Sequence, residues 1–225
     1  MNLILRSFGL IRNNKLLGGL SQEQLREFAA SFKEVRFKKK EMAFSPGRYS
    51  REIFLITEGR IKVFLTYPDG KEFILTLLEP GDIYSGHTRA FGQALEDSVM
   101  LLVPLHTFQK MLVKYPELTS SLVRVLGDAL KHSLDVIERL VFMESRDRLA
   151  KLLYQWACSR GVPRDGGVLV NTGLTRDELA SLIGATRQTL ATLIKDFEGR
   201  QVIKVYKRSI FVRDLEALKR MIFEN

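Results

Sequence analysis

The 225 residues give room for two modest domains, and a content of 45% hydrophobic and 27% charged residues is typical of a folded chain rather than a disordered one. No apolar run approaches the roughly 18 residues that span a bilayer, and residues 1–10 lack the apolar core of a secretory signal, so we expect a cytoplasmic protein without a membrane partner. The net charge of +9 favours a polyanionic partner, while the single cysteine, Cys158, which we expect to be a buried thiol, excludes a disulfide framework and a four-cysteine iron–sulfur site within one chain.

The first half of the chain has helical spacing followed by strand patterns. The stretch up to about residue 37 is helical in its apolar spacing, with Ser21 as the expected cap. From 35 to 103, short alternating runs are separated by Gly/Pro turns. The runs 61–65 and 73–77 flank Pro68-Asp69-Gly70, which indicates a hairpin. Short strands of this kind predict a small antiparallel β-barrel or jelly roll.

A long helix is predicted from Pro116 to about Phe142, because apolar residues recur at steps of three and four. The apolar stripe is wide enough to pack on its own domain and also on a second copy of the chain. A helix near 25 residues also projects beyond a compact barrel, which favours dimerisation over the alternative of an intrachain core helix. The positions that form the stripe are Leu118, Leu122, Val125, Ala129, Val136 and Leu140, flanked by Leu126, Leu130 and Ile137.

The last part of the chain contains a pair of capped helices joined by a glycine. Another helix comes first, followed by a loop over residues 161–167 and a brief strand at 168–170. Thr175 and Glu178 have the spacing of a capping box, and Thr186 can cap the next helix. Gly184 between the two helices supplies the tight turn that a helix-turn-helix requires.

The outer face of the second helix has the side chains that read DNA bases. Arginine bonds bidentately to guanine and glutamine to adenine, while threonine contacts a thymine methyl or a phosphate. Alternating runs around Lys207-Arg208 then predict a basic hairpin suited to phosphate contact. The alternative, that any amphipathic helix pair has polar outer faces, does not account for caps, glycine turn and basic hairpin in this order. The predicted DNA-binding residues are Arg187, Gln188, Thr189, Thr192, Lys195, Lys207 and Arg208.

Residues 178–189, 58–63 and 80–82 resemble motifs of the CRP/FNR family of transcription regulators. The resemblance implies an α+β fold: an N-terminal, cyclic-nucleotide-binding-like antiparallel β-barrel or jelly roll, a long dimerisation helix and a C-terminal winged helix-turn-helix. The corresponding domains are 1–115, 116–143 and 144–225. The family implies a homodimer through the 116–143 helix on a palindromic double-stranded operator, with RNA polymerase as a further partner.

The effector must be inferred from the sensor loop. Cyclic-nucleotide members of the family have Gly-Glu-Leu where this chain has Ser85-Gly86-His87, and Arg-Ser where it has Asp97-Ser98. A carboxylate facing a cyclic phosphate costs Coulomb energy, so cyclic AMP is not expected. The cysteine count excludes the iron–sulfur cluster of the FNR branch.

Residues 81–91 resemble the CooA subgroup, which are haem-containing carbon monoxide sensors. The resemblance implies haem b with His87 as an axial ligand to the iron and the α-amine of Met1 as the opposite ligand. Some members have a cysteine where this chain has Ser85, so thiolate ligation is not expected. His106 and His132 are expected to be structural or surface residues. Candidate side chains for an apolar haem pocket are Phe73, Leu75, Leu77, Phe91, Leu122 and Leu126.

The sequence therefore predicts a ligand-gated transcription regulator in which carbon monoxide binding to haem reorients the DNA-binding domains. One alternative is a regulator of the same fold that responds to a non-haem small molecule. A loop histidine taken by itself is more often solvated or hydrogen-bonded than ligating. A purely structural dimer would show no salt-dependent DNA binding. An enzyme is not expected, because we find no nucleophile constellation, phosphate loop or metal cluster in the sequence.

Overall fold

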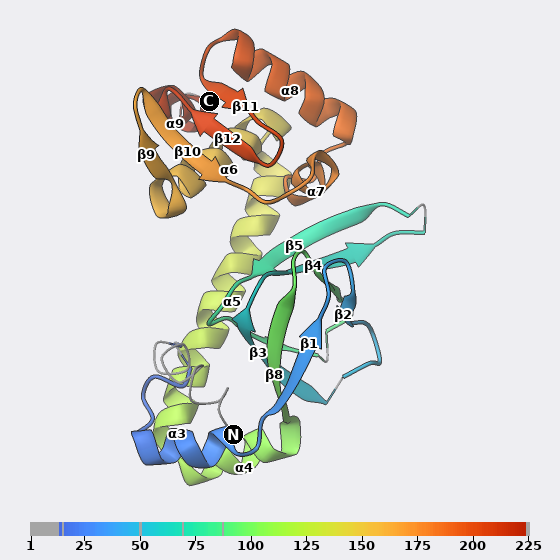
Figure 1. The fold of residues 1–225 in the computed structure, drawn as a ribbon, viewed down its shortest axis with the longest axis vertical. Helices are drawn as coiled ribbons and strands as arrows, with labels where there is room; N and C mark the ends of the chain where they lie inside the picture. The colour runs from blue at the N-terminus through green and yellow to red at the C-terminus, as the bar shows by residue number, and fades with distance from the viewer. Residues whose placement is uncertain (1–13, 15, 50, 69, 87, 224–225) are drawn as a thin grey trace. The chain divides into compact units, whose positions relative to one another are not determined.

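The computed structural model describes residues 14, 16–49, 51–68, 70–86 and 88–223. The chain divides into two compact units, which we describe separately (Figure 1). The first unit comprises Met1–Lys71 and Leu75–Ser133, and the second comprises Glu72–Ile74 and Leu134–Asn225. This division into two units does not test the three domains expected from the sequence, which therefore remain a prediction.

In its described residues, the first unit is built on two four-stranded sheets with helices packed against one of them. The sheet orders are β1-β8-β3-β6 and β2-β7-β4-β5, and the strand pairs with a defined register are antiparallel. This confirms the predicted antiparallel, β-rich sensor fold. Its elements are α3 (Gln22–Ala29), β1 (Lys33–Phe37), β2 (Met42–Phe44), β3 (Glu52–Glu58), β4 (Ile61–Thr66), β5 (Glu72–Leu78), β6 (Ile83–Ser85), β7 (Phe91–Ala94), β8 (Ser98–Pro104) and α4 (Leu105–Lys114).

Strands β3 and β8 are buried on both of their faces. Phe54 pairs with Leu102 and Leu55 with Leu101. Phe54 and Leu102 belong to the core inside the β-roll, whereas Leu55 and Leu101 belong to a second core beneath the helices. Burial on both faces explains why these two strands are continuous apolar runs rather than alternating ones.

Aromatic side chains fill the core of the β-roll. The Phe44 and Phe54 rings stack with centroids 5.1 Å apart, and the Tyr84 ring also stacks on Phe44, with centroids 5.3 Å apart. Tyr49 meets Phe54 edge-on at 6.1 Å. Stacked and edge-on pairs at these separations are favourable beyond their area of contact, so this cluster holds together strands that are distant in sequence.

The second core is formed by helices packed against β3 and β8. Phe28 of α3 and Phe108 of α4 are fully buried there, with ring centroids 6.0 Å apart. α4 was not predicted from the sequence. The predicted helical stretch to residue 37 was also too long, because the chain leaves α3 at Ala30 and pairs as β1 with β8 from Lys33 onward. Tertiary strand pairing overrides local helical spacing at this point.

The long helix α5 (Pro116–Phe142) is one unbroken helix of 27 residues and contributes to both units (Figure 1). Its first turns contact the helical core of the first unit through Leu118, which is buried. This confirms the predicted long helix. Among the described residues, no helix is long and apolar enough to cross a membrane.

The second unit contains a four-stranded sheet, in the order β11-β12-β10-β9, surrounded by helices. Strand β9 and helix α9 were not predicted, and β9 lies inside the predicted 161–167 loop, where Val162 pairs with Leu169. The elements are α6 (Ser145–Arg160), β9 (Val162–Arg164), β10 (Gly167–Asn171), α7 (Arg176–Leu182), α8 (Arg187–Gly199), β11 (Ile203–Val205), β12 (Ser209–Val212) and α9 (Leu215–Phe223).

Cys158 is exposed, so the prediction of a buried thiol was wrong. The buried face of α6 runs through Leu149, Leu153 and Ala157 at steps of four residues. Cys158 follows Ala157 directly and is therefore turned by about 100° away from that face, as the helical repeat requires.

Replacing Phe54 with alanine is expected to lower the free energy of unfolding by about 3–5 kcal/mol, because the change leaves a cavity between the stacked Phe44 ring and the edge-on Tyr49 ring. Urea denaturation followed by circular dichroism measures the difference. The control is Tyr67→Ala, at a side chain that is 55% exposed, where a change within about 0.5 kcal/mol is expected. Equal effects of the two substitutions would show that the aromatic cluster does not hold the roll together.

Candidate functional site

The two helices of the predicted reading motif are capped as the sequence indicates. The Thr175 hydroxyl accepts the Glu178 amide hydrogen bond at 3.2 Å, and the Thr175 amide donates to the Glu178 carboxylate at 2.7 Å. Gly184, after the end of α7, has a φ of +62°, which is the left-handed conformation that glycine adopts without strain. The Thr186 hydroxyl then accepts from the Thr189 amide at 3.1 Å and begins α8.

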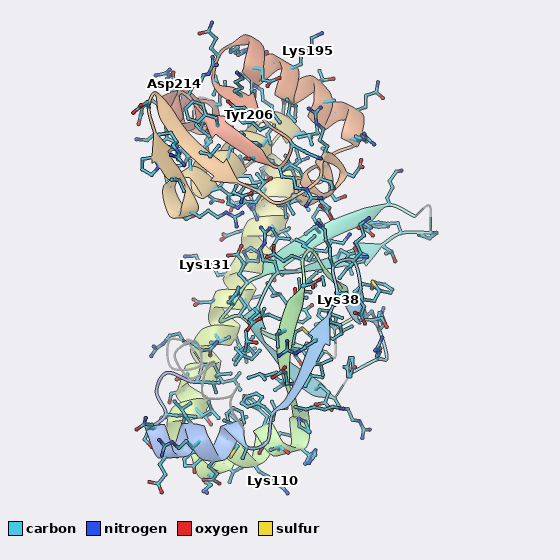
Figure 2. All side chains as sticks on the ribbon, in the orientation of Figure 1. Lys38, Lys110, Lys131, Lys195, Tyr206 and Asp214 are labelled. Carbon is cyan, nitrogen blue, oxygen red and sulfur yellow. The ribbon has the colours of Figure 1, made fainter. Side chains whose placement is uncertain are left out.

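Helix α8 buries one face and exposes the other. Leu190, Ile194 and Phe197 are buried in the core of the second unit. The five helix residues that were predicted to contact DNA are all exposed, and Lys195 is labelled on α8 in Figure 2. The exposed set consists of Arg187, Gln188, Thr189, Thr192 and Lys195. Arg187 is held near the start of α7 by Asp177, with 3.4 Å between Nη1 and Oδ2.

The β11–β12 hairpin forms the predicted wing. The Tyr206 amide donates to the Ser209 carbonyl at 2.8 Å and closes the turn that contains Lys207 and Arg208. Both of these side chains are exposed, as is Tyr206, which is labelled in Figure 2. Within the described part of the chain, no ion pair involves Lys207, Arg208 or Lys195. Their charges are therefore available to an external anion.

Sequence reasoning missed Thr172, which fixes the position of the wing. The Arg208 carbonyl accepts hydrogen bonds from the Thr172 amide at 3.1 Å, the Gly173 amide at 3.1 Å and the Thr172 hydroxyl at 3.0 Å. Thr172 is buried. At the other side of the hairpin, the Val205 amide donates to the Glu198 carboxylate of α8 at 2.9 Å. The wing is thus tied both to the segment before α7 and to the end of α8.

The outer face of α5 has a long row of exposed apolar side chains. Leu126 is 59% exposed and Phe142 is 82% exposed. Contiguous apolar surface of this kind marks an interaction site. The row consists of Val123, Leu126, Leu130, Leu134, Ile137, Leu140, Val141 and Phe142.

His87 and Met1, the predicted haem ligands, lie outside the described residues. The residues on either side of position 87 are fixed in place. The Gly86 amide donates to the Glu52 carbonyl at 3.0 Å, and the Tyr84 hydroxyl lies 2.9 Å from the Thr88 hydroxyl. Burial raises the pKa of Tyr84, and the bond to Thr88 partly offsets this rise.

The side chains proposed for an apolar haem pocket are only partly buried. Leu75 and Leu122, in the first unit, each pack against one of its cores and remain partly accessible. Phe91 is stacked on Phe64 with centroids 5.7 Å apart. Phe73 and Leu77 are also half-buried, and Leu126 is exposed on α5.

Asp97, which the resemblance places at the position of the phosphate-binding arginine of cyclic-nucleotide sensors, lies on the surface of the first unit. Its carboxylate accepts from Lys38 Nζ at 2.8 Å and from the Lys39 amide at 3.0 Å. The hydrogen bond from Lys38 is the main reason that the pKa of Asp97 is lowered. Asp97 therefore offers an anion that is already paired, and no cation for a cyclic phosphate.

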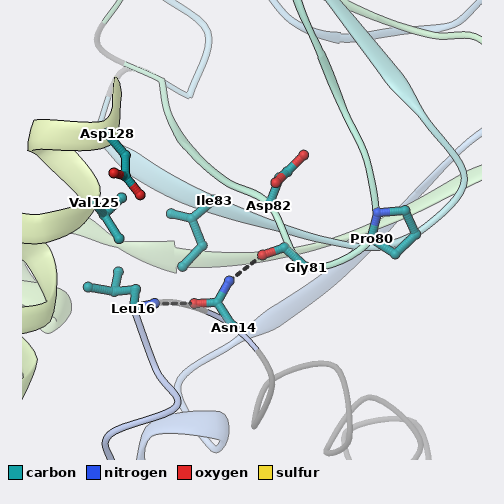
Figure 3. A pocket seen from close by; sticks show the side chains of 8 residues that line it. All are labelled: Asn14, Leu16, Pro80, Gly81, Asp82, Ile83, Val125 and Asp128. Atoms are coloured by element: carbon teal, nitrogen blue, oxygen red, sulfur yellow. Dashed lines mark hydrogen bonds between the residues drawn. The ribbon is translucent and has the colours of Figure 1, made fainter. Parts of the chain in front are cut away.

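The first unit has a cavity of about 360 Å³ that sequence reasoning missed (Figure 3). The side chain of Asn14 lies between Leu16 and Gly81: its amide donates to the Gly81 carbonyl, and its oxygen accepts from the Leu16 amide at 2.8 Å. These bonds hold the chain at Asn14 against the turn that precedes β6. The cavity is lined by Asn14, Leu16, Pro80, Gly81, Asp82, Ile83, Val125 and Asp128.

Two family models match the two halves of the chain. Residues 34–115 match a cyclic nucleotide-binding domain, and residues 147–221 match a Crp-like helix-turn-helix domain. A solved structure of a CooA mutant from Carboxydothermus hydrogenoformans is 38% identical, covers 91% of both chains and has a TM-score of 0.80. The chain belongs to the CRP/FNR family of transcription regulators.

More distant CRP/FNR relatives respond to different signals. The CRP-like cAMP-activated global transcriptional regulator of Mycobacterium tuberculosis is 25% identical over 209 residues, which is 90% of this chain and 93% of the relative. The global nitrogen regulator of Synechococcus elongatus is 25% identical over 192 residues, covering 81% and 86%. This CRP/FNR protein is therefore a ligand-responsive, DNA-binding transcription regulator and not an enzyme, as predicted. Members of the family typically form homodimers.

Replacing Thr172 with valine in this CRP/FNR regulator is expected to lower the free energy of unfolding by about 1–2 kcal/mol, because the hydroxyl loses its bond to the Arg208 carbonyl of the wing and the bond it accepts from the Leu174 amide. We also expect faster hydrogen exchange at the Tyr206 amide, measured by mass spectrometry. The control is Thr192→Val, at an exposed threonine on α8. If the two substitutions change exchange in the wing equally, Thr172 does not fix the wing.

Proposed function

We propose that this regulator senses carbon monoxide through a haem group held by His87, and that it binds a palindromic operator as a homodimer. The observation that carries the proposal is the 38% identity over 91% of the chain to CooA. A second solved structure of the same protein is described as a CO-dependent transcription factor. The similarity of residues 81–91 to haem-containing members supports the same effector.

The proposed ligands for haem are the imidazole of His87 and, on the opposite side, the α-amine of Met1. A neutral imidazole is a strong axial ligand, whereas an amine must first lose its proton. When bound, haem b would supply an iron that can bind carbon monoxide. Gly86 and Thr88, on either side of position 87, are hydrogen-bonded to Glu52 and Tyr84, and partly buried leucines such as Leu75 and Leu122 would contribute to the proposed apolar pocket.

The homodimer is proposed to form through the exposed apolar row of α5. Leu126, Leu130, Leu134, Ile137 and Val141 follow one another at steps of four and three residues, which is the repeat of a two-helix seam. A ligand can shift the arrangement of such a dimer only by its differential affinity for the two states. Carbon monoxide must therefore bind the active arrangement more favourably than the inactive one. This difference in binding free energy must exceed the free energy by which the resting dimer favours the inactive arrangement.

For DNA recognition we propose two groups of residues with different roles. Arg187 and Gln188 lie at the start of α8, the end of a recognition helix that faces base edges. Thr189, Thr192 and Lys195 lie further along the same exposed face. Lys207 and Arg208 on the wing contact phosphates, and they therefore add affinity without sequence preference. RNA polymerase is the proposed protein partner of the DNA-bound dimer.

The absorption spectrum tests the haem proposal. Protein produced with haem available is expected to keep a Soret band through purification, and carbon monoxide is expected to shift that band. Replacing His87 with alanine should remove or shift the resting band, because the strong axial ligand is lost. His132→Ala is the control, since His132 is exposed on α5. Wild-type protein without a Soret band, or an unaltered band in His87→Ala, would contradict haem ligation by His87.

Alanine substitutions separate the two groups of DNA-binding residues. Arg187→Ala and Gln188→Ala should each cost roughly 1–3 kcal/mol on the preferred operator and relax base preference, because each removes bidentate contacts to one base. Lys207→Ala and Arg208→Ala should weaken binding to all sequences and reduce the salt slope by about 1 each. Fluorescence anisotropy on selected and scrambled duplexes at several salt concentrations measures both effects. Equal losses on both duplexes for Arg187→Ala would refute its role in base recognition.

A second candidate effector is a non-haem small molecule bound in the first unit. The match to a cyclic nucleotide-binding domain and the cavity beside Asn14 and Val125 favour this possibility. The two candidates differ in one measurement. Operator binding that responds to a metabolite and is indifferent to carbon monoxide would favour the non-haem effector.

A further inference from the structure

Arg148, on the first turn of α6, hydrogen-bonds to the distant turn between α7 and α8 and also to residues beside the start of its own helix. Its Nε donates to the Ile183 carbonyl at 2.7 Å, and its Nη2 donates to the Gly184 carbonyl at 3.3 Å. On the other side, Nη1 donates to the Met143 carbonyl, and Nη2 donates to the Ser145 hydroxyl at 2.9 Å. All of these residues belong to the second unit.

Three of the four acceptors of Arg148 are carbonyls at the C-terminal ends of helices, and the fourth is the Ser145 hydroxyl. Ile183 and Gly184 form the turn between α7 and α8, and Met143 follows the last residue of α5. Carbonyls at helix C-termini have no partner within their helix, and a cation there also interacts favourably with the helix dipole. One guanidinium thus satisfies the C-terminal ends of both α5 and α7.

The geometry requires an arginine. Only a planar guanidinium offers donors in several fixed directions, whereas a lysine ammonium is a single point at the end of a flexible chain. Burial lowers the pKa of Arg148, an effect that neighbouring Asp147 opposes. The ordinary pKa of arginine is so high that the side chain keeps its charge at physiological pH. The hydrogen bonds are therefore charge-assisted, which roughly doubles their strength.

The backbone link between α5 and α6 is short and has little other polar support at its start. Only Met143 and Glu144 separate the two helices, and Glu144, the N-cap of α6, makes no side-chain capping bond. The contacts of Arg148 to Met143 and to the α7–α8 turn therefore bridge this link from the side.

We propose that Arg148 is a positioning residue that fixes the helix-turn-helix on the C-terminal end of α5. This inference rests on the proposed function as a DNA-binding dimer. With the tie intact, the arrangement of two α5 helices sets the separation of the two α8 helices. Without these hydrogen bonds, each α8 still contacts its half-site. The dimer then no longer selects operators with one particular spacing between the half-sites.

The test uses full-length protein produced with haem, in the presence of carbon monoxide, and operators selected under the same conditions from random duplex DNA. Affinity is measured for a single half-site, for the selected two-half-site operator, and for the same operator with five base pairs inserted between the half-sites. Arg148→Lys is expected to bind a single half-site as the wild type does. Its preference for the selected spacing should fall by about tenfold, the change expected when charge-assisted bonds of this size are lost. The matched control is Arg220→Lys, at an exposed arginine of α9 in the same unit.

Hydrogen exchange provides a second readout that does not depend on DNA. In Arg148→Lys, the amides of residues 183–185 should exchange faster while the buried amides of β10 and β12 stay protected. Arg148→Met, which also removes the charge, should show the same pattern more strongly. If either variant unfolds, loss of β10 and β12 protection identifies it, and the folded variant provides the result.

Three results distinguish the possible failures. If Arg148→Lys has the same spacing preference as the wild type, the role of Arg148 is overturned and the proposed function is left intact. Unchanged exchange at residues 183–185 in a folded variant also overturns that role. Wild-type protein that prefers no duplex and no spacing overturns the proposed function, and the positioning role with it.

Discussion

The pairing of β3 with β8 is the contact on which the first unit depends. Phe54 and Leu102 point from this pair into the β-roll, while Leu55 and Leu101 point into the helical layer. The pair therefore connects the sheet that contains β6, which leads into the sensor loop, to the helical layer that holds the first turn of α5. A change inside the roll and a displacement of the first turns of α5 act on opposite faces of the same two strands, which are too closely packed to deform gradually.

The helix-turn-helix was predictable because its signals are local. The capping box of Thr175, the Gly184 turn and the Thr186 cap each involve residues within four positions of one another. The hairpin around residues 68–70 was predictable for the same reason. The elements that were missed lacked such signals: the N-cap of α4 is Pro104, which makes no capping bond. Strand β9 contains Pro163, which suggests a loop in sequence and is tolerated here because β9 is an edge strand.

The residues that position the site could not be predicted from the sequence. Asn14 bonds to Gly81, Thr172 to Arg208 and Arg148 to Ile183, and the partners are 67, 36 and 35 residues apart. A single asparagine, threonine or arginine has no sequence periodicity from which such a distant partner could be predicted. Sequence reasoning therefore identified the side chains that face outward on α8 and the wing, and missed the ones behind them that hold these elements in place.

Gly86 lies at a point of the sensor loop where the surrounding atoms leave no room for a side chain. A Cβ at this position would collide with the Tyr49 carbonyl and approach the Phe54 ring, so the backbone there admits no side chain at all. The residues at positions 85 and 88 do have side chains: Ser85 ends β6, and the Thr88 hydroxyl is hydrogen-bonded to Tyr84. Any residue other than glycine at position 86 would therefore require this stretch of the loop to follow a different path.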